Sequence, residues 1–519
     1  MEINPSHDAI DIVRRLQDAG FDAVLAGGCV RDALLGKTPH DWDIATSATP
    51  DQVSGIFPKC FSVGRAFGTT VIPGSDGENY EVTTFRGEGK YSDGRHPDEI
   101  RFVGMREDVM RRDFTVNALL YDPMAHRLLD FVDGQKDLRA RILRTVGDPA
   151  RRFEEDRLRV MRAVRFAAVL GFHVEEETWR AVCAMAPQVT PCVSSERIRD
   201  EIEKMLLCGV SARGLILMEQ SGLLDAILPE VAAGRGVAQP PQYHPEGDVW
   251  QHELKLMGFL DEAFTRIRFC GETPAANERF DSEGRLAAAT HAEWRCLCWG
   301  ALLHDIGKPL TYVEGEDRIH FNGHDVQGAT LAEVVMQRLK LPSEVVTNAK
   351  ALVRQHMEIT QITKARLSKQ RRHFQDPLYP LLIELLRLDT SASFGILDLH
   401  RQVVGLWKEE QARPHPPKPS INGRDLIERG FKPNADLGAF LAFCADYELE
   451  HPFANRTEAL DWLDNALRTK KKVIIEPRMD TNGTRIIFHR EESSAWMARL
   501  ARRFLRAPRM CSLLPPPHF

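Results

Sequence analysis

The chain has 519 residues, of which 43% are hydrophobic and 27% are charged, and its formal net charge is −6. This composition is typical of an ordinary folded protein with three or four domains, at about 100–200 residues per domain. The negative charge argues against a protein that coats nucleic acid over its whole surface, although it allows a local basic track. No run of about 18 apolar residues is present, and the first residues lack the basic start and apolar stretch of a secretion signal. The sequence therefore predicts a cytoplasmic protein that does not enter a membrane.

The stretch LAGGCVRDALLGKTPHDWDIATSATP has the pattern of a strand, a glycine turn, a short helix and a second strand. Gly27 and Gly28 allow the backbone to approach a ligand closely, and the helix start behind them suits phosphate together with the charge of Arg31. Because side chains alternate across a strand, Asp41 and Asp43 are predicted to share one face. Two adjacent carboxylates repel each other unless a divalent cation lies between them. The segment therefore predicts a phosphate site and a metal site in one cleft, although an isolated acid pair is more often a solvated surface.

Two further strands are predicted over TTVIPG and NYEVTTFR, which a tight turn connects. Glu81 on the second of these strands is either a third carboxylate beside the two aspartates or an ordinary solvent-facing side chain, and both interpretations stay open. The segment GEGKYSDGRHPDEIRFV, which follows, is rich in glycine, aspartate, arginine and proline, and this composition predicts a loop.

A second motif, MREDVMRRDFTVNALLYDP, places Asp113 and Asn117 four residues apart, so that they are predicted to share one face of a helix. Arg111 and Arg112 precede them. Guanidinium groups suit phosphate oxygens, and a carboxylate or an amide suits ribose hydroxyls. The alternative is that Asp113 only caps a helix and that the arginines are solvated.

The succession GGxVRD, DxD and RRDFTVNA resembles the head of the tRNA nucleotidyltransferases that add CCA to tRNA 3′ ends, and of the bacterial poly(A) polymerases. The resemblance implies an α+β fold, with a polymerase β-like head sheet over residues 1–145 and mostly helical domains after it. It implies that Arg112, Asp113 and Asn117 contact the incoming nucleotide and distinguish ribose from deoxyribose. It also implies that the YSDGRxP loop helps to switch the choice of nucleotide.

Residues 146–240 are predicted to form a helical neck and body, supported by a capped helix over SSERIRDEIEKMLL. Nine arginines lie between positions 139 and 165, a basic patch suited to a triphosphate or an RNA backbone. Four charged side chains recur every third residue, so on a helix each would be displaced around the exposed side relative to the one before: Asp156, Arg159, Arg162 and Arg165. The resemblance implies that the EDxxR element at 155–159 pairs with the base edge of C and then of A. Without the head motifs, an ordinary ion pair on a helix would be the better interpretation.

A Pro- and Gly-rich linker, GVAQPPQYHPEGD, precedes a histidine-rich region that we assign to residues 241–400. Imidazole and carboxylate groups suit a transition metal or Mg²⁺, and one or two such ions can activate water for phosphoester cleavage. The order H…HD…H…H…D, with HDIGKP, resembles the metal-dependent HD phosphohydrolases. It implies ligands to a first divalent metal at His252, His304, Asp305 and Asp389, and a second ion or a phosphate at His324 and His356. A single histidine on an apolar helix would more often be an ordinary buried residue.

Residues 401–519 are predicted to form a helical tail. Within it, INGRDLIERGFKPNADLGAFLAF resembles the segment that follows the HD domain in the family, and NRTEALDWLDNAL predicts a capped amphipathic helix. The final LLPPPHF predicts disorder.

These motifs together predict a template-independent CCA-adding enzyme with an HD domain, whose partners are tRNA, ATP and CTP. In this hypothesis Asp41 and Asp43 bind Mg²⁺ and are catalytic. The nucleotide is bound by residues of the head and neck: Gly27, Gly28, Arg31, Arg112, Asp113, Asn117, Asp156, Arg159, Arg162 and Arg165. Three alternatives remain: an enzyme that adds only A or poly(A), an HD phosphohydrolase whose head merely presents RNA, and a catalytically silent RNA-binding protein.

Overall fold

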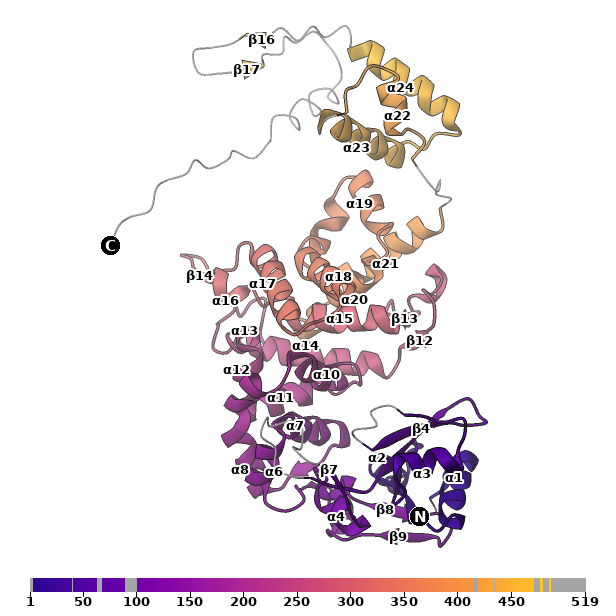
Figure 1. Cartoon of the computed structure of the whole chain (residues 1–519). Coiled ribbons are helices and arrows are strands. Elements are labelled where there is room, and N and C mark those ends of the chain that lie inside the picture. The colour runs from indigo at the N-terminus through magenta and orange to yellow at the C-terminus, as the bar shows by residue number, and fades with distance from the viewer. Residues whose placement is uncertain are drawn as a thin grey trace, which may run out of the picture. The chain divides into compact units, whose positions relative to one another are not determined.

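The computed structural model describes residues 3–39, 41–62, 68–88, 100–413, 419–433 and 435–470, and two short paired segments at 477–478 and 485–486. The chain divides into two compact units, Met1–Pro414 and His415–Phe519. The predicted α+β fold is confirmed, with one mixed sheet near the N-terminus and helices through most of the remaining elements (Figure 1). The YSDGRxP loop and the final LLPPPHF lie outside the described residues. The four domain boundaries drawn from the sequence stay predictions.

A seven-stranded sheet forms the head, with the strand order β3-β4-β5-β2-β1-β8-β9. Its strands are β1 (Ala23–Ala26), β2 (Ile44–Thr46), β3 (Phe61–Ser62), β4 (Thr69–Pro73), β5 (Asn79–Thr84), β8 (Leu120–Asp122) and β9 (Arg127–Leu129). The central strand β1 pairs antiparallel with β2 and β8, and β2 pairs parallel with β5. The predicted hairpin is confirmed, because β4 and β5 pair antiparallel around their turn. A separate hairpin joins β6 (Arg86–Glu88) to β7 (Ile100–Phe102).

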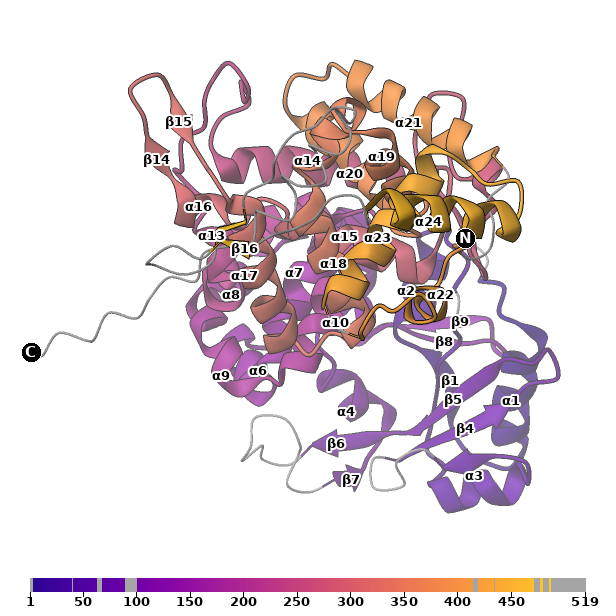
Figure 2. The same ribbon diagram turned by 90° about the horizontal axis from the view of Figure 1, so that it is seen from above.

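Both faces of β1 are buried, which explains its uninterrupted apolar sequence. Ala23 and Leu25 belong to the main core together with the buried face of α1 (His7–Asp18), and α3 (Pro50–Ile56) packs against α1 and β4. Val24 and Ala26 point to the other face, where they pack with Val109 of α4 (Met105–Met110). Figure 2 shows strands β1, β5 and β4 of this sheet, with α1 and α3 near them.

The neck and body consist of short helices: α5 (Gly134–Ala140), α6 (Pro149–Glu155), α7 (Leu158–Leu170), α8 (Glu176–Met185), α9 (Val189–Cys192), α10 (Ser195–Leu206), α11 (Ser211–Ser221), α12 (Leu223–Ile227) and α13 (Pro229–Ala232). The predicted helix over SSERIRDEIEKMLL is confirmed as α10. Asp156 does not lie on a helix, in contrast to the prediction, because it is an extended residue between α6 and α7. It therefore does not share a helix face with Arg159 and Arg162.

The histidine-rich region continues the same hydrophobic core, since its apolar side chains pack with those of the head and neck. Its helices are α14 (Val249–Phe264), α15 (His291–Leu303), α16 (Lys308–Thr311), α17 (His324–Arg338), α18 (Ser343–Gln355), α19 (Leu367–Phe374), α20 (Tyr379–Ala392) and α21 (Asp398–Gln411). Helices α14, α15, α18 and α20 pack against one another, and a small hairpin joins β14 (Val313–Glu314) to β15 (Ile319–His320).

The second unit has its own apolar core, formed by α22 (Gly423–Ile427), α23 (Ala435–Glu450) and α24 (Arg456–Lys470). The predicted capped helix over NRTEALDWLDNAL is confirmed as α24, where Asn455 Oδ1 accepts a hydrogen bond from Glu458 N at 3.0 Å. Within the described part of the chain, no helix is both long enough and apolar enough to span a bilayer.

The central strand allows a first test. Leu25 is fully buried in β1, so Leu25→Ala is expected to destabilise the head by about 2–5 kcal/mol through lost apolar contacts and a residual cavity. The measurement is the free energy of opening of head peptides by hydrogen–deuterium exchange. The matched control is Met124→Ala, because Met124 is 42% exposed and should change this free energy by less than about 0.5 kcal/mol.

Candidate functional site

The glycine turn after β1 brings the two head motifs into contact. Gly27 has a φ of 85°, in the left-handed region that favours glycine, and helix α2 (Gly28–Leu34) starts directly after it. A Cβ atom at this position would lie 3.0 Å from Nη1 of Arg112. Gly27 N donates to Leu119 O at 3.1 Å, and Gly27 O accepts from Arg31 N at 3.2 Å. The turn therefore leaves no room for a side chain between the first motif and the second.

Asp41 and Asp43 lie just before strand β2, which begins at Ile44, so the predicted strand is wrong in its start. The predicted alternation is nevertheless present, because both aspartates are exposed whereas Trp42 and Ile44 are buried. Asp43 O already accepts a hydrogen bond from Ala26 N at 3.0 Å, which continues the ladder of the sheet. The two carboxylates thus face solvent from one edge of the β1–β2 pair.

Glu81 on β5 adds a third negative charge beside this pair. In the parallel pairing Ile44 lies opposite Val82, so Asp43 and Glu81 are the preceding residues on neighbouring strands. Loss of solvent around its carboxylate, then the charges of Glu81 and Asp41, raise the pKa of Asp43 to about 6, although Arg112 acts in the opposite direction. Of the two interpretations of Glu81, this proximity favours a third carboxylate. Among the described residues, the carboxylates of Asp41, Asp43 and Glu81 do not form a group whose ligand oxygens all lie within 4.8 Å of one another.

The buried carboxylate of Asp113 joins the second motif to the neck. Its Oδ1 accepts from Phe114 N at 2.8 Å and from Asn117 Nδ2 at 3.1 Å, and its Oδ2 accepts from Arg162 Nε at 2.8 Å and Nη2 at 2.5 Å. Burial alone would raise the pKa of Asp113, but the charge of Arg162 lowers it. The predicted helix through these residues is wrong, since α4 ends at Met110 and residues 115–117 form a 3-10 turn. The side chains of Asp113 and Asn117 meet all the same.

Asn117 extends this set of contacts to the glycine turn. Its Oδ1 accepts from Nη1 of Arg31, which is 7% exposed and also forms two 2.8 Å hydrogen bonds with Asp32. Three guanidinium groups lie over the ring of Phe166, at 5.2, 5.1 and 3.8 Å from its centre: Arg31, Arg162 and Arg165. Side chains of α2, the second motif and α7 are therefore held in one polar and aromatic cluster.

Asp108, which the sequence analysis did not single out, orients the arginines of the second motif. This carboxylate is 1% exposed, and it pairs with Arg111 at 2.8 Å and with Arg112 at 3.1 Å. Nη1 of Arg112 also donates to Asn117 O at 3.4 Å. The spacing of three and four residues between Asp108 and the two arginines was the available signal.

The residues expected to select the base have other partners in the neck. Arg159 is 9% exposed and pairs with Glu155 at 2.7 Å, whereas Asp156 accepts from Nη2 of Arg197 on α10 at 2.9 Å. Arg165 pairs with the buried Glu201, also on α10, at 2.5 Å. Arg162 and Arg165 therefore belong to the cluster around Asp113 and Phe166, whereas the side chains of Asp156 and Arg159 have their ion-pair partners outside it.

The six residues expected at the HD site lie around one point: His252 on α14, His304 and Asp305 after α15, His324 at the start of α17, His356 after α18 and Asp389 on α20. Among these six residues, two groups have all their ligand atoms within 4.8 Å of one another, one of His252, His304 and Asp389 and one of Asp305, His324 and His356. His252 also forms a group of this kind with His244 and Glu246. Asp305 connects the first two groups, since its Oδ2 lies 3.3 Å from Nε2 of His304 and its Oδ1 lies 3.5 Å from Nε2 of His324.

The imidazole rings are oriented as metal ligands usually are. Three of them donate Nδ1–H to a carbonyl three residues earlier, at 2.7–2.8 Å: His304 to Ala301, His324 to Phe321 and His356 to Val353. This leaves Nε2 for a metal. Among the described residues, the buried Nε2 atoms of His252 and His304 have no hydrogen-bond partner. Burial and the charge of His304 lower the pKa of His356 to about 4. The donor set fits one or two divalent ions.

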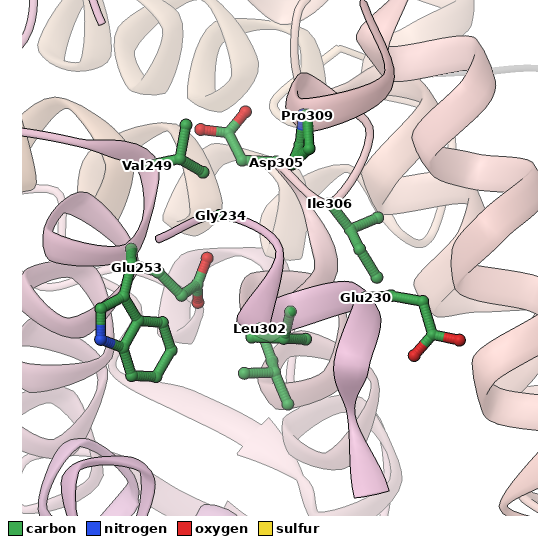
Figure 3. Close-up of a pocket in the computed structure, with 10 residues that line it drawn as sticks. Glu230, Gly234, Val249, Glu253, Leu302, Asp305, Ile306 and Pro309 are labelled. Atoms are coloured by element: carbon green, nitrogen blue, oxygen red, sulfur yellow. The ribbon is translucent and has the colours of Figure 1, made fainter. Parts of the chain in front are cut away.

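A small pocket is lined by three acidic residues, Glu230, Glu253 and Asp305 (Figure 3). Its remaining walls are mostly apolar: Val231, Val249, Trp250, Leu302, Ile306 and Pro309. Glu253 is 4% exposed, and its Oε2 lies 3.6 Å from Nδ1 of His304. Burial in these surroundings raises the pKa of Glu253 to about 8, so that its carboxyl group is mostly protonated at pH 7.

Comparison with known protein families gives three matches. The poly(A) polymerase head domain matches residues 23–144, a probable RNA and SrmB-binding site of polymerase A matches 171–234, and the HD domain matches 284–390. Residues 23–144 thus resemble the poly(A) polymerase head domain. The resemblance seen in the GGxVRD, DxD and RRDFTVNA motifs is confirmed, as is the resemblance of HDIGKP to the HD domain.

Curated relatives of this chain are named CCA-adding enzymes. That of Leuconostoc mesenteroides is 46% identical over 213 residues, which cover 40% of this chain and 52% of that protein. That of Geobacillus stearothermophilus is 44% identical over 229 residues, which cover 44% of this chain and 56% of that protein. The chain therefore spans about half the length of the curated relatives it matches.

Solved structures extend the likeness beyond the head domain. A crystal structure of the Bacillus stearothermophilus CCA-adding enzyme in complex with CTP covers 90% of this chain and 98% of its own, with 28% identity and a TM-score of 0.64. The Thermotoga maritima CCA-adding enzyme complexed with tRNA covers 88% of this chain and 94% of its own, with a TM-score of 0.52. Its identity is 17%, so it supports the fold alone.

The buried pair of Asp113 and Arg162 generates a second test. Asp113→Asn is expected to lower the free energy of unfolding of the head by about 1–3 kcal/mol at pH 7, because Arg162 then lacks its anion. Since the folded-state pKa of Asp113 is lowered, the pair contributes its stability above the unfolded pKa of about 3.9 and loses it as the pH falls further. Urea unfolding at pH 7 and pH 3, with Asp398→Asn at an exposed position as the control, measures both effects.

Proposed function

We propose that the chain is a CCA-adding nucleotidyltransferase that uses CTP and ATP to add C, C and A to tRNA 3′ ends without a nucleic-acid template. The observation that carries this proposal is the solvent-facing pair Asp41 and Asp43, with Glu81 beside it, next to the Gly27 turn of a poly(A) polymerase head domain. The curated relatives named CCA-adding enzymes support it. So does the complex of such an enzyme with CTP.

Asp41 and Asp43 would hold Mg²⁺, with Glu81 close enough to assist. When bound, Mg²⁺ supplies activation of the tRNA 3′-hydroxyl and stabilises the departing pyrophosphate. Loss of solvent, together with the negative charges of Glu81 and Asp41, raises the pKa of Asp43 to about 6, and a cation at this edge would offset these charges. Oxygen ligands are the donors that Mg²⁺ prefers.

The protein itself contributes the binding and orientation of the nucleotide. Gly27 lets the triphosphate approach the backbone, while Arg112 is held ready by Asp108 to contact it. Asp113 and Asn117 are tied to each other, and in this proposal they meet the ribose.

Selection of the base is assigned to the neck. Asp156 and Arg159 supply an acceptor and donors of the kind that can pair with a base edge, and both side chains are prearranged by their partners on α6 and α10. Arg162 and Arg165 are engaged with Asp113 and Glu201, so we assign them the positioning of this surface.

We further propose that the HD site holds a divalent metal and hydrolyses phosphoesters. The two groups of ligand-type atoms connected by Asp305 carry this proposal, together with the unpartnered Nε2 atoms of His252 and His304. A bound divalent ion would supply a water molecule activated for attack on phosphorus. A divalent metal at the HD site and a cytoplasmic location stay predictions.

The head activity has a direct test. Purified chain is given tRNA that lacks its CCA end, with CTP and ATP, and the 3′ ends are sequenced. Wild type is expected to add CCA, and Asp41→Ala and Asp43→Ala are expected to lower the rate at least about 100-fold, or ~2.7 kcal/mol, since each removes a metal ligand. Asp18→Ala, at an exposed position on α1, is the matched control. Equal rates for wild type and Asp41→Ala would refute the assignment, and tRNA extended by A alone would favour the A-adding alternative.

The HD activity is tested separately with a phosphomonoester such as p-nitrophenyl phosphate and added divalent metal. His304→Ala is expected to abolish this hydrolysis, because His304 belongs to the first group of ligands and also contacts Asp305. The same variant is expected to retain CCA addition. Loss of CCA addition together with hydrolysis would instead support the alternative in which the head only presents RNA to the HD site.

A further inference from the structure

A buried glutamate outside the expected ligand set lies against His252. Oε1 of Glu246 accepts Nδ1–H of His252 at 2.6 Å and Nδ1–H of His244 at 2.9 Å. The other three histidines of the site donate to neutral backbone carbonyls. Among the described residues of the site, His252 is therefore the histidine whose Nδ1 is held by a carboxylate.

The loop before α14 is built to keep Glu246 there. Asp248 caps α14, with its side chain accepting from Gln251 N at 2.8 Å and from Gly236 N at 2.7 Å. Gly247 has a φ of 130°, and a Cβ atom there would lie 1.9 Å from Oε1 of Gln251. The loop thus turns sharply after Glu246 and places its side chain, which is 4% exposed, beneath His252.

The charge of Glu246 is costly to bury. Its second oxygen, Oε2, is buried and has no hydrogen-bond partner in the described part of the chain. Burial raises the pKa of Glu246, but the hydrogen bonds from His252 and His244 outweigh this effect and lower it to about 2. A backbone carbonyl orients an imidazole equally well, as at the other three histidines. What the carboxylate adds is negative charge, which strengthens Nε2 of its histidine as a metal donor.

Glu246 is hydrogen-bonded to a member of only one of the two groups of ligand atoms in the HD site. His252 belongs with His304 and Asp389, whereas Asp305, His324 and His356 form the second group. Nζ of Lys308 lies 2.6 Å from Oδ2 of Asp305, the oxygen that faces His304. The positive charge of Lys308 makes this oxygen a weaker metal donor to the first group. Glu246 supplies the compensating charge on that side.

We propose that Glu246 is a positioning residue which, through Nδ1 of His252, makes the His252–His304–Asp389 group the tighter of two unequal metal subsites. The inference rests on the proposed HD metal centre. It means that one ion stays bound at low metal concentration and that the ion at His324 and His356 exchanges more readily. The role of Glu246 is to set the affinity of the first subsite without contacting the ion.

The test measures metal binding rather than activity. Metal-free full chain carrying Asp41→Asn and Asp43→Asn, which silences the head, is titrated with Co²⁺ by calorimetry and visible absorption. We expect two binding steps, of which His304→Ala removes the tighter and His356→Ala the weaker. Glu246→Gln keeps an acceptor oxygen but loses the charge, and it should weaken the tighter step about 10–100-fold while leaving the weaker step unchanged. Glu272→Gln, at an exposed position of the same region, is the matched control and should match the parent.

The outcomes separate this inference from the metal centre itself. A parent that binds no Co²⁺ overturns the centre, and the inference with it. Two parental steps that are unchanged in Glu246→Gln overturn the inference and leave the centre in place. Equal weakening of both steps, with a lower melting temperature of the metal-free protein, shows a merely structural role and also overturns it. Selective weakening at an unchanged metal-free melting temperature supports the role of the charge.

Discussion

The ion pair between Asp113 and Arg162 is the contact on which the arrangement of the head and neck depends. A buried carboxylate is tolerated only when its lone pairs are satisfied, and this one accepts from two head groups and from a neck guanidinium. Asn117 carries the same set of hydrogen bonds on to Arg31 at the glycine turn. The glycine turn and helix α7 are therefore parts of one polar structure, and a shift of α7 would change both motifs of the head.

Helix α10 connects this structure to the HD site. On one side its buried Glu201 holds Arg165 of α7. Two residues further along, Glu203 accepts from Nε and Nη2 of Arg295 on α15, both at 2.6 Å. Helix α15 ends at the residue before His304. The two candidate sites thus lie in one continuous core, and charged contacts on a single helix link the elements that carry them.

The local sequence pattern was sufficient to predict the structure where the backbone is regular. The apolar run of β1, the glycine turn and the alternation of Trp42 with the two aspartates all follow from short-range geometry, and all are present. Periodicity failed where tertiary contacts decide the backbone. Asp113 and Asn117 have helical spacing, yet Phe114 bridges to Thr145 and pulls the chain out of a helix. Asp156 similarly ends α6, with its carboxylate accepting from Arg197 of α10.

The histidines of the HD site were predictable because the types of residue that bind metals are few and their order along the chain is distinctive. The residue that holds Nδ1 of His252 leaves no such pattern. Glu246 is an ordinary acid in a polar stretch of the sequence, and its importance comes from burial of its side chain against an imidazole. Glu246 lies six residues before His252, a spacing without meaning in a helix, and it reaches the ring only because the loop reverses at Gly247. Contacts of this kind depend on loop conformation and on the buried charge they balance, so they are found from the structure and not from the spacing of residue types.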